Sequence, residues 1–133
     1  SAMAAYADIL KAEPGNSRAK VESAMTAVER GDARGAEETL MHAVSDPDAT
    51  REVFYSLGEV KLAGNDGDAA AGWFEKASSA DPYWAKPLVR LGEAAMKKGD
   101  LAGAARLLAR AIAVDPTAPE AAAARTMLAS LNK

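Results

Sequence analysis

Acidic residues and one histidine are the side chains with the greatest capacity for chemistry in this sequence. His42 is the only histidine, and the run Asn65-Asp66-Gly67-Asp68 is rich in the oxygen ligands that calcium prefers. An EF-hand loop beginning at Asp66 would need an oxygen ligand at position 70 and a glutamate at position 77, but both residues are alanine. A lone histidine is more often an exposed polar residue than a catalytic base. We therefore expect no catalytic residue, no metal site and no cofactor.

The composition narrows the class of protein further. The chain has 133 residues, enough for one compact domain, and 33 of them are alanine, which favours closely packed helices. The net charge of −3 comes from interspersed acidic and basic residues, which is unlike the basic footprint of a nucleic-acid-binding protein. No apolar run has the length of a membrane span, so we expect no membrane insertion. The absence of cysteine suits cytoplasm and periplasm equally.

An internal repeat organises the sequence. The pairs Gly31-Asp32, Asn65-Asp66 and Gly99-Asp100 follow one another at a spacing of 34 residues, and each is typical of a turn whose aspartate caps a helix. Other positions recur with the same period. The recurring sets are Ala36, Ala70 and Ala104; Leu40, Phe74 and Leu108; and Ala43, Ala77 and Ala111.

This pattern resembles the tetratricopeptide repeat (TPR), a helix-turn-helix unit of 34 residues. Residues 85–118 match it best, residues 51–84 carry Lys61 where an aromatic is usual, and residues 17–50 diverge most, with Lys20 at another aromatic position. The matching residues of the best copy are Leu88, Leu91-Gly92, Ala95, Gly99, Ala104, Leu108, Ala111 and Pro116.

The resemblance implies an all-α fold, an α-solenoid wound as a right-handed superhelix in one domain. We expect three full repeats (17–50, 51–84 and 85–118), a partial N-terminal repeat helix (3–14) and a C-terminal capping helix (119–131). The paired helices are predicted at 17–30 with 33–45, 50–63 with 66–80, and 84–98 with 101–114.

In TPR proteins, the first helices of the repeats line a concave groove that binds peptide segments of partner proteins. The resemblance therefore implies a peptide-binding groove, with some apolar members equally able to pack between helices. Its expected residues are Arg18, Val21, Met25, Tyr55, Glu59, Leu62, Lys86, Val89, Arg90, Glu93, Met96 and Lys97.

One known TPR groove holds C-terminal carboxylates of chaperones with two lysines, two asparagines and an arginine. Lys86 and Arg90 match two of those five positions, but Val21, Met25 and Ser56 occupy the others, so we do not expect chaperone-tail binding.

The sequence thus predicts a non-enzymatic interaction module whose partner is a protein or peptide. The alternative is a structural segment of a longer repeat array that self-associates or docks through its ends. In either case we expect a monomer or a weak homo-oligomer.

Overall fold

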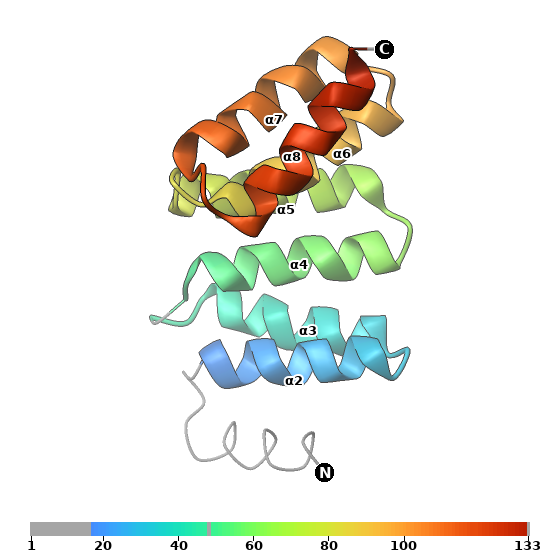
Figure 1. Ribbon diagram of the computed structural model, residues 1–133. Coiled ribbons are helices and arrows are strands. Elements are labelled where there is room, and N and C mark those ends of the chain that lie inside the picture. The colour runs from blue at the N-terminus through green and yellow to red at the C-terminus, as the bar shows by residue number, and fades with distance from the viewer. Residues whose placement is uncertain (1–16, 48, 133) are drawn as a thin grey trace. The chain divides into compact units, whose positions relative to one another are not determined.

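The computed structural model describes residues 17–47 and 49–132, and the helix expected at 3–14 lies outside them. Seven α-helices make up the described part of the chain, which contains no strand (Figure 1). They are α2 (Ser17–Glu29), α3 (Ala33–Val44), α4 (Arg51–Ala63), α5 (Gly67–Ala80), α6 (Ala85–Lys97), α7 (Leu101–Val114) and α8 (Pro119–Leu131). Each lies within one residue or so of a range expected from the sequence, so the all-α prediction is confirmed. None of these helices is long and apolar enough to cross a membrane.

The tight turns inside the helical pairs follow the 34-residue period in detail. Gly31, Asn65 and Gly99 all have a positive φ, of 84°, 62° and 81°. This left-handed conformation is easy for glycine and tolerable for asparagine, which explains the residue types at this step. The aspartate that follows each turn caps the next helix, as predicted. Its Oδ1 accepts a hydrogen bond from the backbone N–H three residues later, at 2.9, 3.1 and 2.9 Å respectively.

By its internal contacts the chain divides into two compact units, residues 1–73 and residues 74–133, with the boundary inside α5. The grouping of the helices into three repeats of one domain stays a prediction.

In the first unit, α2, α3 and α4 pack on one another around a small apolar core (Figure 1). Alanines make up much of this core, and their small side chains let the helix backbones approach closely. The buried members are Ala24, Ala27, Ala36, Leu40, Ala43, Val53, Leu57 and Val60.

Two lysines in this unit occupy positions where the repeat pattern expects an aromatic side chain, and both form ion pairs. The Lys20 Nζ lies 2.6 Å from the Asp46 Oδ2, and the two side chains are only 11% and 12% exposed. The Lys61 Nζ lies 2.7 Å from the Glu37 Oε1 in a more open setting, with side chains 25% and 37% exposed. An electrostatic contact therefore occupies the place of aromatic packing at both positions.

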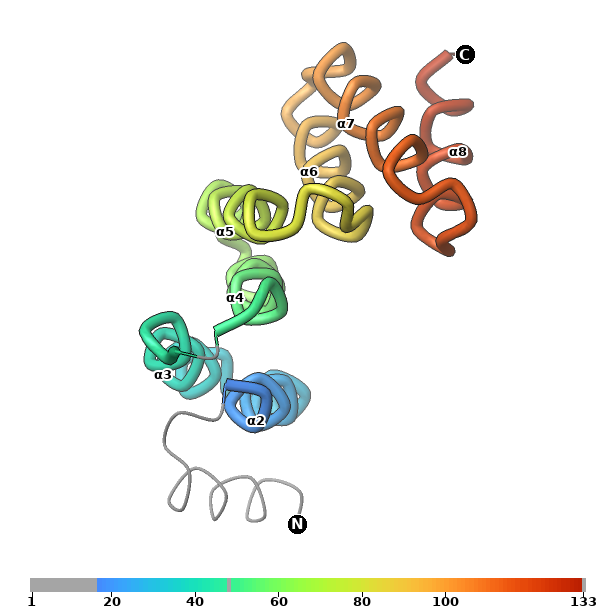
Figure 2. The backbone as a smooth tube through the Cα atoms, turned by 90° about the vertical axis from the view of Figure 1, so that its left-hand side faces the viewer, coloured from blue at the N-terminus to red at the C-terminus, as the bar shows by residue number. Residues whose placement is uncertain are grey.

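In the second unit, α7 packs against both α6 and α8 (Figure 2). Its core contains Ala85, Leu88, Val89, Leu108, Ala111 and Ala124, all buried. Gly92 of α6 meets Leu108 of α7 so closely that a Cβ atom at position 92 would lie 2.8 Å from the Leu108 Cδ2. Glycine at this position is thus what allows the two helices their close approach.

Candidate peptide-binding surfaces

The first candidate surface lies on α2 and α4, the first helices of two successive pairs. These helices contact each other directly. An open pocket of about 500 Å³ lies between their N-terminal turns, lined by Ser17, Arg18, Val21, Glu22, Thr50 and Glu52. Arg18 and Val21, two of the residues expected in the groove, are thus brought together at one pocket.

Charged side chains of both signs surround this pocket. The Arg18 Nε lies 3.6 Å from the Glu22 Oε1, and the Arg51 Nε lies 3.1 Å from the Glu52 Oε1. Partial burial raises the pKa of the Glu52 carboxyl, but hydrogen bonds from the Thr50 side chain, its own backbone and Arg51 outweigh this effect. The pKa of Glu52 therefore lies below its ordinary value of 4.5, and the carboxylate stays ionised at neutral pH.

The apolar residues expected on this surface contribute to the core as well. Val21 and Met25 are half-buried and pack against the buried cluster of the first unit. Tyr55 is only 8% exposed, whereas Glu59 and Leu62 are half-buried. A ligand on this surface would therefore reach the edges of these side chains and the full length of Arg18, which is exposed.

The second candidate surface lies on α6 and is richer in basic groups. Lys86 and Lys97 are exposed near the two ends of the helix, and between them Arg90 and Glu93 form an ion pair of 3.2 Å. Met96 is half-buried against the core of the second unit, and Val89 is 6% exposed. The surface therefore offers cationic groups beside a thioether that can adapt to ligands of different shape.

His42 is exposed on α3, as expected of a polar surface residue, in a shallow pocket of about 420 Å³. The pocket is lined by Arg34, Glu37, Glu38, Met41 and His42. In the described part of the chain, no three His, Cys, Asp or Glu side chains lie close enough to hold a metal ion.

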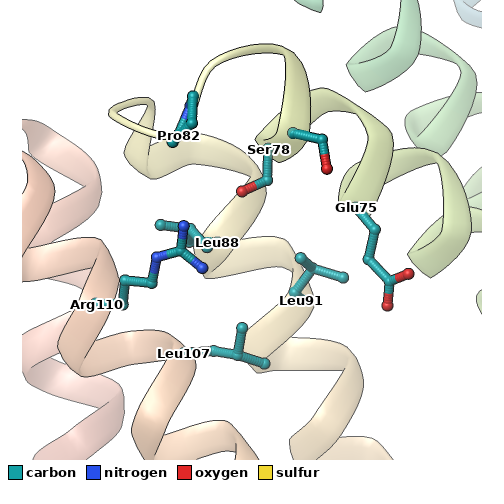
Figure 3. Close-up of a pocket in the computed structure, with 8 residues that line it drawn as sticks. Glu75, Ser78, Pro82, Leu88, Leu91, Leu107 and Arg110 are labelled. Atoms are coloured by element: carbon teal, nitrogen blue, oxygen red, sulfur yellow. The ribbon is translucent and has the colours of Figure 1, made fainter.

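A further pocket lies among α5, α6 and α7, and sequence reasoning did not identify it (Figure 3). Leu88, Leu91 and Leu108 match the repeat pattern. Nothing in their spacing showed that Leu88 and Leu91 would also border open space beside Glu75 and Arg110.

The chain matches two family models, each described as a tetratricopeptide repeat, over residues 61–128 and 21–83. No curated protein matches it.

Three solved structures share its fold. A crystal structure of MamA is 24% identical with a TM-score of 0.74, over 86% of this chain and 67% of that one. The type III secretion chaperone SycD of Yersinia enterocolitica, solved with a peptide of the translocator YopD, is 19% identical with a TM-score of 0.77, over 85% and 89%.

YrrB, described as a TPR protein with an unusual peptide-binding site, is 18% identical with a TM-score of 0.68. That match covers 86% of this chain but only 59% of YrrB, so this chain spans less than two thirds of that protein. At identities this low, the structural similarity establishes a common fold and nothing further. Membership of the family rests on the family models, the first of which alone covers half of the sequence. The chain belongs to the tetratricopeptide repeat family.

Proposed function

We propose that this chain is a non-catalytic interaction module that binds a peptide or helical segment of a partner protein. The binding residues are those of the α2 and α4 surface and of the α6 surface. The observation that carries the proposal is the open pocket between α2 and α4, whose lining includes Arg18 and Val21, two residues that the repeat pattern assigns to ligand binding. The SycD structure holds a peptide and YrrB is described by a peptide-binding site, so the same fold serves this purpose elsewhere.

The two surfaces favour different groups on the ligand. Lys86 and Lys97 on α6 favour an acidic side chain or a terminal carboxylate on the ligand. The paired Arg90 and Glu93 side chains offer a hydrogen-bond donor and an acceptor between them. On α2 and α4 the ionised Glu52 and the half-buried Glu59 favour basic groups. A segment with an apolar anchor beside an acidic group is therefore complementary to the α6 surface, and a segment with an apolar anchor beside a basic group is complementary to the α2 and α4 surface.

Charge reversal on α6 tests the proposal. We expect the double variant Lys86→Glu and Arg90→Glu to recover at least fivefold less partner than the wild type from a lysate of the source cells. The reason is that two attractive contacts become repulsive at the binding surface. The measurement is quantitative mass spectrometry of the bound proteins after capture on each variant.

The matched control is Lys76→Glu with Arg106→Glu, which makes the same change of net charge at two exposed residues of α5 and α7. Equal recovery by the α6 variant and the wild type, with both folded by circular dichroism, would show that the α6 surface does not bind the partner.

Self-association is a second candidate function, favoured by the distribution of charge along the chain. Residues 1–73 contain 13 acidic and 7 basic residues, a net charge of −6, whereas residues 74–133 contain 6 acidic and 9 basic residues, a net charge of +3. Such asymmetry favours head-to-tail contacts between copies. Light scattering between 10 μM and 1 mM, in low and high salt, would then show a molar mass that rises with concentration only in low salt. A constant monomer mass in both would eliminate this candidate.

A further inference from the structure

The pocket among α5, α6 and α7 lies wholly within the second unit and apart from the binding surfaces proposed above. It has a volume of about 500 Å³ and is lined by Glu75, Ser78, Ser79, Pro82, Leu88, Leu91, Leu107 and Arg110. On α6, the helical spacing places Leu88 and Leu91 on the face opposite to Arg90, Glu93 and Lys97. A ligand in this pocket would therefore meet the side of α6 that the groove does not use.

Apolar side chains from two helices form one part of the pocket. Leu88 and Leu91 of α6 are buried, and the half-buried Leu107 of α7 lies beside them (Figure 3). On the α5 side the lining consists of Glu75 and of Ser78 and Ser79, whose small side chains leave the space open. The space is large enough for a short segment of a partner, and a Leu, Met or Phe side chain at the centre of that segment has the polarity that suits the leucine surface.

Two opposite charges flank this apolar surface. Figure 3 shows Arg110 and Glu75 on opposite sides of the pocket, with Leu88 and Leu91 between them. Both residues are exposed, and neither side chain forms an ion pair within the part of the chain that the structure describes. Each is thus available to an opposite charge on a ligand.

We propose that this pocket is a second docking site, independent of the groove, for a short partner segment in which one apolar residue lies between an acidic and a basic residue. The apolar side chain packs on Leu88, Leu91 and Leu107. The acidic group pairs with Arg110, and the basic group pairs with Glu75. Charge complementarity selects this occupant, because a segment with two acidic or two basic groups would face a like charge at one side.

Synthetic peptides test the assignment directly. The main probe is a 12-residue alanine-based helix that carries Asp, Leu and Lys one turn apart. One companion peptide has Lys in place of the Asp, and a second companion has Ser in place of the Leu. Binding is measured by fluorescence anisotropy up to millimolar protein. We expect wild-type protein to bind the Asp–Leu–Lys helix at least fivefold more tightly than either companion.

The variant Arg110→Glu should reverse that preference. Its pocket would contain two carboxylates, so it should bind the Lys–Leu–Lys helix at least fivefold more tightly than the Asp–Leu–Lys helix. The matched control is Arg106→Glu, an exposed residue one turn earlier on α7 that does not line the pocket. It should keep the wild-type order of affinities, which separates the pocket from the effect of net charge.

Four results would overturn the proposal. One is an absence of binding at millimolar protein, and another is an equal response of the two arginine variants. The third is loss of peptide binding in the Lys86→Glu, Arg90→Glu variant, which would assign the peptides to the α6 surface. Self-association that depends on Arg110 without any peptide preference would likewise identify a second copy as the occupant. Capture of a partner by the α6 surface is tested separately, by recovery of that partner on the Lys86→Glu, Arg90→Glu variant.

Discussion

Replacing Asp46 with alanine should lower the free energy of unfolding by about 3–5 kcal/mol, among the largest effects that a single substitution in this chain can have. Asp46 and Lys20 form an ion pair of 2.6 Å whose side chains are nearly nine-tenths buried. Removing the carboxylate leaves the Lys20 ammonium group buried without its counter-charge. Urea unfolding followed by circular dichroism measures the loss.

The second ion pair of the same unit supplies the control. Lys61 and Glu37 lie 2.7 Å apart but are considerably more exposed, so Glu37→Ala should cost about 1 kcal/mol or less. The double variant Lys20→Met with Asp46→Asn should regain most of the stability lost in Asp46→Ala, since it leaves no unpaired buried charge. Equal losses in Asp46→Ala and Glu37→Ala would contradict the view that burial makes the Lys20–Asp46 pair important.

Replacing Leu108 with alanine should destabilise the second unit by about 2–5 kcal/mol. Leu108 is fully buried in the core of that unit, and its side chain lies against the backbone of Gly92. Truncation removes apolar contacts and leaves a cavity between α6 and α7. Leu107 next to it is only half-buried, so Leu107→Ala should cost less than half as much.

The same contact can be tested in the opposite direction. Gly92→Ala would place a Cβ atom 2.8 Å from the Leu108 Cδ2 and 2.9 Å from its Cγ. Overpacking of this kind costs about 1–3 kcal/mol, of which the better helix propensity of alanine offsets about 1 kcal/mol. Combining Gly92→Ala with Leu108→Ala relieves the clash, so the double variant should lose less stability than the sum of the two single variants. Strict additivity would show that the close approach of α6 and α7 does not depend on this pair.

The positions of the helices were predictable because local signals repeat at a fixed period. A residue able to adopt a left-handed conformation at 31, 65 and 99, followed each time by an aspartate, fixes where one helix ends and the next begins. Buried alanines at the same period, such as Ala36 and Ala104, indicated which faces pack.

Contacts between distant residues could not be predicted in this way. Lys20 departs from the repeat pattern, but nothing near it in sequence identifies Asp46, 26 residues later, as its partner. The depth to which Tyr55 and Val89 are buried depends on several helices at once, so the pattern placed them on a surface without indicating how little of each is accessible. The pocket beside Arg110 depends on small residues in α5 together with leucines in α6 and α7. Because these residues come from three separate helices, no local sequence pattern predicts that they line one pocket.

Site-specific photo-crosslinking in the source cells tests the central claim most directly. The photoreactive residue p-benzoylphenylalanine would replace Lys86, which is exposed on the proposed α6 binding surface, or Glu38, which is exposed on α3 outside all three proposed binding sites. If the chain binds its partner through the α6 surface, position 86 should yield one dominant crosslinked protein and position 38 should yield at least fivefold less of it. Equal yields from the two positions, or a product from position 38 alone, would contradict the claim.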